Sequence, residues 1–265
     1  MVESMPNASP SKALIRVPPK PNRIGRFFGF LRNALKREIW AHLAQLPLGG
    51  LSMLVPKSAL EAQAAKGSKR PLVLVHGLGG HPGNFTALEA KLRIAGLGQI
   101  YRVDLRGVAT MKAGASKLQG LIETILAVNG LPEDGEVDII AHSMGGVMVR
   151  TAMLNPKVSK RVAKLITLGS PHHGSHLAWY LSHAVGPGAE LSPDDALWSQ
   201  LAAQEPWLRD GTLTSFYTEQ DCLVRPAQSC RVEGADNRER SVETHFSFLW
   251  SQSVFTEIFD VLRHD

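Results

Sequence analysis

Cysteine is scarce in this sequence, which has only Cys222 and Cys230 among its 265 residues. Two cysteines cannot build a disulfide framework, although this pair, eight residues apart, is near enough in sequence for one local bridge. Long apolar runs are also missing, and none approaches the roughly 18 uncharged residues that span a bilayer. A chain of this length can bury a core without disulfides or a structural metal. The sequence therefore predicts a globular protein without a transmembrane helix.

Acidic residues are few in the first quarter of the chain. Residues 1–70 carry 12 lysines and arginines but only three acidic residues, whereas residues 71–265 carry 17 basic and 21 acidic residues. The net charge of +5 therefore reflects the N-terminal segment rather than the whole surface. The main domain has no excess of positive charge that would attract a polyanion, so we expect no nucleic-acid partner.

Residues 1–65 divide into a flexible arm and a basic amphipathic helix. Five prolines interrupt residues 1–23, so this stretch cannot sustain a helix or a strand. In residues 24–46 apolar side chains recur at three- and four-residue steps, and basic side chains lie off that stripe. Such a helix either packs on a protein surface or makes a peripheral contact with an anionic membrane. Because no cleavable signal sequence is evident, we expect a cytoplasmic or peripheral membrane protein.

From residue 71 onward, short β-branched runs alternate with segments of helical length. This alternation is typical of a mostly parallel sheet flanked by helices, so residues 66–265 are expected to form one α/β domain. The expected strands are residues 71–75, 100–103, 137–140, 163–168 and 213–217, and the expected helices are residues 84–96, 114–129, 144–154 and 246–263.

A serine between small residues follows the third expected strand, in the run Ala141-His142-Ser143-Met144-Gly145. A sharp turn from strand to helix needs small residues two positions before and after the serine, since larger side chains would strike neighbouring strands. At the start of the helix, backbone N–H groups also favour developing negative charge. Ser143 is therefore the candidate nucleophile, and a serine that only caps the following helix is the plainer alternative.

The first expected strand ends in a glycine-rich turn, His76-Gly77-Leu78-Gly79-Gly80. Glycine lets the backbone approach a bound carbonyl group and point an N–H group at it, as an oxyanion hole requires. Leu78 is the candidate donor in this turn, and Met144, after the serine, is the other. A dinucleotide-phosphate loop is disfavoured because the glycine spacing does not fit G-x-G-x-x-G.

These motifs together resemble the α/β-hydrolase superfamily, in particular bacterial triacylglycerol lipases and esterases whose nucleophile turn reads A-x-S-x-G. The resemblance covers about residues 70–263 and includes a third motif at residues 167–175, Thr-Leu-Gly-Ser-Pro-His-His-Gly-Ser. It implies an α/β-hydrolase fold and a serine ester hydrolase that needs no cofactor. Residues 1–65 have no counterpart in the small members of the family.

The superfamily's order of serine, acid and histidine directs the search for the partners of Ser143 to the C-terminal part of the chain. Asp221, in the loop after the fifth expected strand, resembles the family's acid, and Glu219 is the rival. His245 precedes the last expected helix and resembles the family's base, whereas His264 lies one residue from the end. The expected catalytic residues are therefore Ser143, Asp221 and His245.

The remaining histidines near these motifs have plainer interpretations. His76 and His142 are expected to be structural parts of their turns. His172, His173 and His176 lack the spacing of a zinc motif, so no metal site is expected.

Residues 175–210 separate two expected strands and are rich in large apolar side chains. They are expected to form a lid or an acyl-chain pocket, with residues 186–188 separating two lid helices, or else an ordinary packing helix with a longer connection.

The expected activity is hydrolysis of lipid-like or short acyl esters through an acyl-enzyme. Two alternatives stay open at this point. One is an acyltransferase or thioesterase that uses the same three residues, and the other is a non-catalytic binding module with the same fold.

Overall fold

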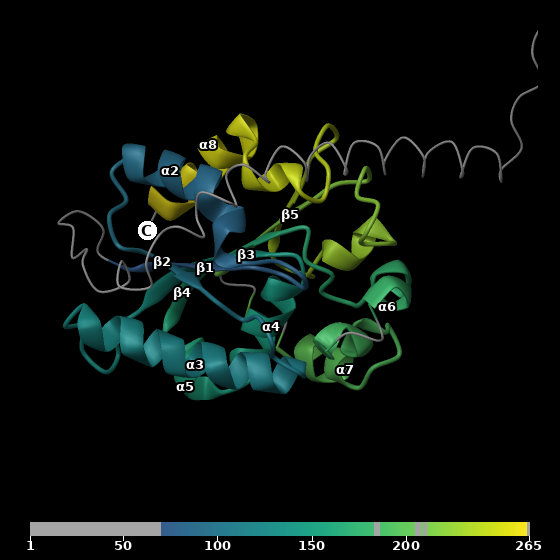
Figure 1. The fold of residues 1–265 in the computed structure, drawn as a ribbon, viewed down its shortest axis with the longest axis horizontal. Helices are drawn as coiled ribbons and strands as arrows, with labels where there is room; N and C mark the ends of the chain where they lie inside the picture. The colour runs from purple at the N-terminus through teal and green to yellow at the C-terminus, as the bar shows by residue number, and fades with distance from the viewer. Residues whose placement is uncertain (1–69, 183–185, 205–207, 209–210, 264–265) are drawn as a thin grey trace, which may run out of the picture.

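A six-stranded sheet organises the part of the chain that the structure describes (Figure 1). The computed structural model describes residues 70–182, 186–204, 208 and 211–263. The arm and the amphipathic helix expected in residues 1–65 lie outside these residues, as does His264. The division of the chain near residue 66 therefore stays a prediction.

All neighbouring strands of this sheet run parallel, and their order is β2-β1-β3-β4-β5-β6. The strands are β1 (Leu72–Val75), β2 (Ile100–Val103), β3 (Val137–His142), β4 (Val162–Leu168), β5 (Leu213–Tyr217) and β6 (Asp236–Glu239). The predicted α/β class and the predicted parallel sheet are thus confirmed.

Helices cover both faces of the sheet, with α2 and α8 on one face and α3, α4 and α5 on the other (Figure 1). The α-helices are α2 (Thr86–Ile94), α3 (Met111–Val128), α4 (Met144–Ala152), α5 (Pro156–Ser159), α6 (His176–Ser182), α7 (Leu197–Ala202) and α8 (Gln252–Arg263). The 3-10 helices are η2 (Pro82–Phe85), η3 (Gly186–Leu191), η5 (Ala227–Cys230) and η6 (Ser247–Leu249). Within the described residues, no helix is both long enough and apolar enough to cross a membrane.

Alternate residues of the central strands face opposite helical layers. In β1, Val73 and Val75 belong to the core formed with α3 and α4, whereas Leu72 and Leu74 belong to the core formed with α2 and α8. Side chains alternate along a strand with a period of two, which explains this division. Because both faces are covered, β1 consists only of buried apolar residues and the other central strands are mostly apolar, which made them recognisable in the sequence.

The path of the chain across the sheet reverses between β1 and β3. From β1 the chain moves outward to the edge strand β2, and β3 then pairs with the other side of β1, with Val75 opposite Ala141. The loops after β1 and β3 therefore leave the same edge of the sheet side by side. Open α/β sheets bind ligands at such a reversal. The two loops are the glycine-rich turn and the serine turn identified in the sequence.

Several elements differ from the expectations, among them the following three. The sequence does not predict β6, because Asp236–Glu239 is an edge strand with only polar side chains and therefore has no apolar face. The helix expected over residues 246–263 is divided into η6 and α8. Helix α3 begins at Met111 instead of residue 114, because the Thr110 side chain accepts a backbone hydrogen bond and caps it.

Candidate active site

Ser143 occupies a strained turn between β3 and α4. Its φ of 56° and ψ of −133° make it the single non-glycine residue with a positive φ in the described part of the chain. Such a conformation costs about 1–3 kcal/mol and persists only where the surrounding packing enforces it. The turn places the serine at the N-terminus of α4, where backbone N–H groups and the helix dipole favour negative charge.

Two glycines let α4 approach the sheet closely enough to form this turn. A Cβ atom added to Gly145 would lie 2.6 Å from the carbonyl oxygen of Val75 and 2.7 Å from that of His76. A Cβ atom on Gly146 would collide with the side chain of Ser170, in the loop after β4. A larger residue at either position would therefore push the start of α4 away from the sheet.

His245 connects Ser143 to Asp221 through both of its ring nitrogens. Nε2 lies 3.0 Å from Ser143 Oγ, and Nδ1 lies 2.7 Å from Asp221 Oδ2. Since a carboxylate oxygen only accepts, the proton is on Nδ1, and the Nε2 lone pair accepts the serine O–H. Asp221 and His245 are 1% and 2% exposed, whereas Ser143 is partly exposed. This arrangement can remove a proton from a serine that a substrate can reach.

Backbone groups orient the Asp221 carboxylate, and a glycine leaves space for it. Asp221 Oδ1 accepts the N–H groups of Leu223 at 2.7 Å and Val224 at 2.8 Å, which leaves Oδ2 for His245. Gly169, which follows β4, has a φ of 58°, and a Cβ there would lie 3.3 Å from both Asp221 Oδ2 and His245 Nδ1. In the sequence Gly169 stands in the motif at residues 167–175, which does not by itself reveal this role. Its position directly after a core strand was the available signal.

Glu219, the alternative acid, is directed away from His245. Its Oε1 accepts a hydrogen bond from Gln228 Nε2 at 2.5 Å, and its Oε2 lies 3.8 Å from Arg225 Nη1. The structure therefore brings Asp221, and not Glu219, to the histidine.

His142, directly before Ser143, is joined to the loop that carries His245. Its Nε2–H donates to the carbonyl oxygen of His245 at 2.8 Å, and the two ring centroids are 4.8 Å apart. Burial lowers the pKa of His142 to about 3, so the ring stays neutral near physiological pH. The sequence predicts His142 only as a structural part of its turn and does not predict this contact, because the two partners are 103 positions apart.

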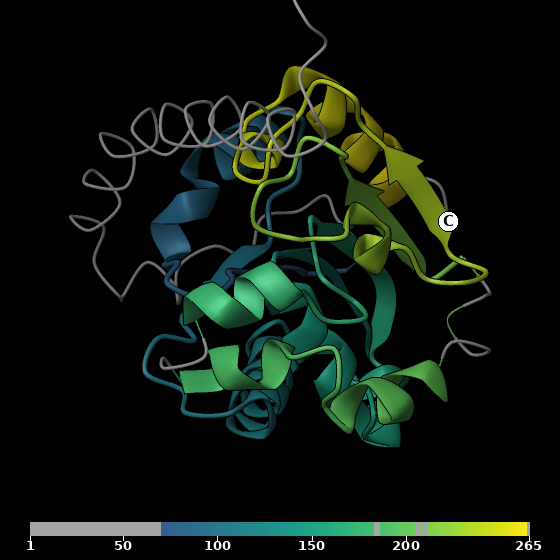
Figure 2. The same ribbon diagram turned by 90° about the vertical axis from the view of Figure 1, so that its right-hand side faces the viewer.

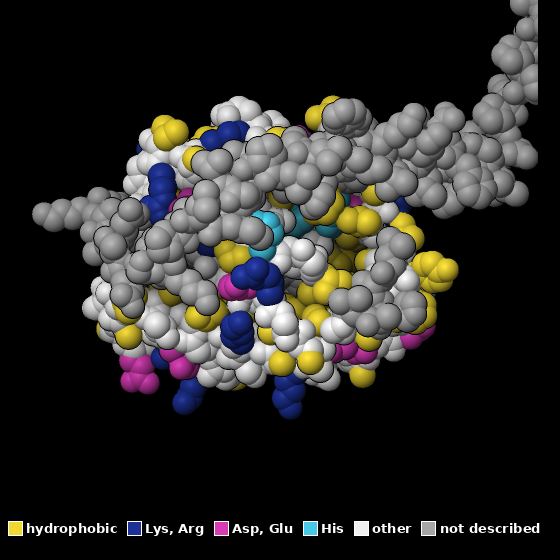
Figure 3. All heavy atoms as spheres, viewed as in Figure 1, with side chains coloured by type: hydrophobic (Ala, Val, Ile, Leu, Met, Phe, Trp, Pro, Cys, Tyr) yellow, Lys and Arg dark blue, Asp and Glu magenta, His cyan; other side chains and the backbone are white. Residues whose placement is uncertain are grey.

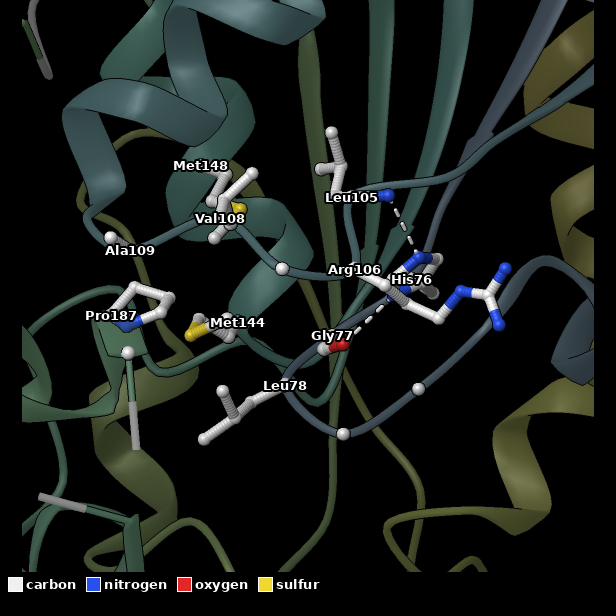
Figure 4. Close-up of a pocket in the computed structure, with 14 residues that line it drawn as sticks. His76, Gly77, Leu78, Leu105, Arg106, Val108, Ala109, Met144, Met148 and Pro187 are labelled. Atoms are coloured by element: carbon white, nitrogen blue, oxygen red, sulfur yellow. Dashed lines mark hydrogen bonds between the residues drawn. The ribbon is translucent and has the colours of Figure 1, made fainter. Parts of the chain in front are cut away.

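Gly77 brings the turn after β1 directly against the serine turn. A Cβ on Gly77 would lie 2.7 Å from Ser143 Cβ and 3.2 Å from Met144 N. His76 holds the turn in place: its Nδ1–H donates to the carbonyl oxygen of Gly77 at 2.9 Å, and its Nε2 accepts the N–H of Leu105 at 3.0 Å (Figure 4). Both ring nitrogens of His76 therefore serve the backbone of these loops.

Leu78 and Met144, the candidate oxyanion residues, line the same cavity, which has a volume of about 470 Å³. The turn after β1, the loop after β2, the start of α4 and the start of η3 form its wall (Figure 4). In the space-filling view, histidine and apolar side chains gather in the middle of this face (Figure 3). The structure thus places both candidate donors at one cavity beside the serine turn.

The other histidines of the region do not converge on a metal site. The buried ring of His172 has Nε2 at 3.0 Å from Thr167 Oγ1, and the exposed His173 has Nε2 at 2.9 Å from the carbonyl oxygen of Arg231. Across the described ranges, no group of three His, Cys, Asp or Glu side chains could hold a metal ion.

The local disulfide that the spacing of Cys222 and Cys230 would allow is not formed. Both cysteines are free and buried. Burial raises the pKa of the Cys230 thiol well above its usual value, so this sulfur stays protonated and unreactive.

The segment expected to be a lid, residues 175–210, has a packed part and an exposed part. Helices α6, η3 and α7 lie together at one end of the sheet (Figures 1 and 2). Four large side chains of η3 and α7 are buried in the core, namely Leu191, Leu197, Trp198 and Leu201. In contrast, α6 exposes Tyr180 at 69% and Trp179 at 36%. The part around α7 is therefore ordinary core packing, and a lid role for α6 stays a prediction.

Known proteins resemble this chain in sequence. Residues 104–183 match the family described as PGAP1-like alpha/beta domain. A triacylglycerol lipase of Burkholderia plantarii is 29% identical over 167 residues, which covers 58% of this chain and 44% of that protein. A triacylglycerol lipase of Vibrio cholerae is 30% identical over 145 residues, which covers 52% of this chain and 44% of that protein. The chain thus matches less than half the length of either relative.

Solved structures resemble its fold. Aspergillus fumigatus lipase B has a TM-score of 0.65 at 20% sequence identity and covers 80% of this chain and 58% of its own. The mature form of Bacillus licheniformis lipase BlEst2 has a TM-score of 0.58 at 20% identity and covers 74% of this chain and 92% of its own. The chain has the α/β-hydrolase fold.

The α/β-hydrolase fold of this chain assembles its site from segments inside and outside the PGAP1-like match. Residues 104–183 include the serine turn and the Gly169 loop. The turn after β1 and the loops that carry Asp221 and His245 lie outside this range. The sheet brings these distant segments of the α/β-hydrolase fold to one edge.

Proposed function

We propose that this chain is a serine carboxylic ester hydrolase of the lipase or esterase type, acting on lipid-like or short acyl esters. The proposal rests on the hydrogen-bonded line from Ser143 through His245 to Asp221, with the serine at the N-terminus of α4. The two triacylglycerol lipases that resemble the chain support an ester as its substrate. Because less than half of each relative is matched, the substrate is part of the proposal.

The first half-reaction transfers the acyl group to the enzyme. His245 Nε2 takes the proton of Ser143 while Oγ attacks the ester carbonyl carbon, and the carbonyl oxygen becomes an oxyanion. The N–H groups of Leu78 and Met144 bind this oxyanion, and Asp221 stabilises the imidazolium ion. When the carbonyl group re-forms, the ester C–O bond breaks, and the leaving alcohol takes the proton from His245.

The second half-reaction returns the enzyme to its starting state. His245 removes a proton from water while the water oxygen attacks the acyl carbon. The second tetrahedral intermediate then expels Ser143 Oγ, which recovers its proton from His245. The products are a carboxylic acid and an alcohol, and these steps require no cofactor.

A fluorophosphonate probe and a soluble p-nitrophenyl ester test this proposal together. The wild type should be labelled and should hydrolyse the ester, whereas Ser143→Ala should lose the label and about 10⁴-fold or more of the turnover, because the nucleophile is gone. Ser116→Ala, at an exposed position of α3, is the matched control and should keep both properties.

Two outcomes would contradict the proposal. A folded wild type that neither takes the label nor hydrolyses esters would favour a non-catalytic binding module. Labelling combined with faster acyl transfer to an added alcohol than to water would favour an acyltransferase. The peripheral membrane contact of residues 24–46 and the cellular location stay predictions, because those residues lie outside the described ones.

A further inference from the structure

The cavity beside the serine turn is lined mainly by apolar side chains. The large ones are Leu78, Leu105, Val108, Met144, Met148 and Pro187. Its volume of about 470 Å³ lies in the range of sites that enclose small ligands. The cavity therefore suits an apolar group attached to the reacting carbonyl.

The cavity presents no uncompensated charge. Arg106 is the one charged side chain from the described residues that lines it. Its guanidinium is bound by Asp104, with Nη2 at 2.6 Å from Oδ2 and Nε at 2.9 Å from Oδ1. His76 also lines the cavity, but both of its ring nitrogens are bonded to backbone groups. A neutral chain fits this lining better than a charged group does.

The position of the cavity relative to His245 distinguishes the acyl side of the ester from the alcohol side. The leaving alcohol takes a proton from His245, so it must lie near Nε2. Of the described residues, none after Pro187 lines the cavity, and the loop that carries His245 is therefore absent from its wall. The alcohol belongs on the His245 side, and the cavity is left for the acyl chain.

Met148 lies at the end of the cavity that is far from the glycine-rich turn after β1. It follows Met144 by one turn of α4, which is about 6 Å along the helix axis. Figure 4 shows Met148 beside Val108, with Leu78 at the opposite end and Met144 and Pro187 between them. Met148 is only 1% exposed and lines this end of the cavity.

The Met148 side chain packs directly against Gly114 of α3. A Cβ on Gly114 would lie 2.8 Å from Met148 Sδ and 3.0 Å from its Cε. Real Cβ atoms do not approach so closely, so an alanine at this position would displace the flexible thioether. Because α3 lies behind the Met148 side chain, the displaced side chain would move into the cavity.

We propose that this cavity receives a neutral acyl chain and that the contact between Gly114 and Met148 sets the longest chain accepted. This inference rests on the proposed ester hydrolysis. Removing the Met148 side chain beyond Cβ lengthens the cavity, whereas adding a methyl group at Gly114 shortens it. The two substitutions should therefore change the chain-length preference in opposite directions.

Hydrolysis of p-nitrophenyl acetate, butanoate, octanoate, dodecanoate and hexadecanoate by purified full-length protein tests the inference. Met148→Ala should move the maximum of kcat/KM to a longer acyl chain, and Gly114→Ala should move it to a shorter one. The ratio of long-chain to acetyl kcat/KM should change about tenfold or more, since one methylene in an apolar pocket is worth roughly 10–200-fold. Gly120→Ala is the control, because a Cβ there meets nothing within 4 Å.

The acetyl ester separates this inference from the proposed function, because its chain does not reach Met148. Absence of hydrolysis of every ester in the series by the wild type would contradict the proposed function itself. Normal acetyl hydrolysis with the same chain-length profile in all variants would overturn the role of Met148. If melting curves show that Met148→Ala is unfolded, Met148→Val replaces it, and a smaller shift in the same direction is expected.

Discussion

Asp221 has a fixed orientation because three hydrogen-bond donors share its two carboxylate oxygens. Two backbone N–H groups use Oδ1, and the His245 Nδ1–H uses Oδ2. This division selects the tautomer in which His245 Nε2 can accept the serine proton. The charge on Asp221 can then stabilise the imidazolium ion that forms during the reaction.

Asp221→Asn should lower kcat for a soluble ester by about 10³–10⁴-fold, because an amide can present an N–H to the histidine and favour the wrong tautomer. Glu219→Gln is the matched control and should stay near wild type, since Glu219 contacts Gln228 and Arg225 instead of His245. Steady-state kinetics on both variants measure the difference. A larger loss of kcat in Glu219→Gln than in Asp221→Asn would show that Glu219 is the acid.

The resemblance to the α/β-hydrolase superfamily led to the prediction that Ser143, Asp221 and His245 belong to one site, with Glu219 as the rival acid, and the structure brings the first three together. The contacts that support these three residues could not be predicted from the sequence. His142 meets the His245 carbonyl across 103 positions, and Gly169 matters only because two other loops converge on it. Such contacts depend on the three-dimensional path of the loops, which residue spacing does not determine.

Helix α4 depends on close approach to the sheet at its first turn. The carbonyl groups that end β1 leave no space for a Cβ at Gly145. Glycine normally weakens a helix, so its presence here reflects packing instead of helix propensity.

Gly145→Ala should therefore lower the free energy of unfolding by about 1–3 kcal/mol through overpacking, and it should also lower ester turnover by moving Ser143. Gly120→Ala, in the open interior of α3, should raise the unfolding free energy by about 0.5–1 kcal/mol, because alanine is the better helix former. Urea denaturation followed by circular dichroism compares the two. Equal effects of both substitutions would show that the close approach at Gly145 does not matter.

Elements with a continuous apolar sequence were the easiest to predict. The buried strands β1 to β5 were located to within one or two residues, because both of their faces meet helices. The polar edge strand β6 gave no such signal. Residues 175–210 contain many large apolar side chains. The sequence could not show that those of α7 are buried, whereas Trp179 and Tyr180 of α6 are exposed.

At the scale of the whole molecule, three buried histidines among the described residues resist protonation. Burial lowers the pKa of His76 and His172 below the ordinary value, and it lowers that of His142 to about 3. Below about pH 6.5 the unfolded chain binds protons that the folded chain excludes. Stability should therefore fall as the pH falls from 6.5 toward the lowered values.

For His142 alone, the expected loss between pH 6.5 and about pH 5 is roughly 2 kcal/mol of unfolding free energy. Urea denaturation at pH 7.5, 6 and 5 measures it. His142→Gln keeps an N–H donor but does not titrate, so its stability should depend less on pH. Parallel pH dependence in the two proteins would contradict the assignment of this loss to His142.

The site extends over most of the described chain, from Gly77 after the first strand to His245 before the last helix. Ser143 precedes its base by 102 positions, so the nucleophile is synthesised well before the group that activates it. On the proposed mechanism, a nascent or half-folded chain carries Ser143 without its base, so the serine does not attack esters. On this mechanism activity begins only when the sheet is complete, so the fraction of molecules that a fluorophosphonate labels should equal the fraction that has finished folding.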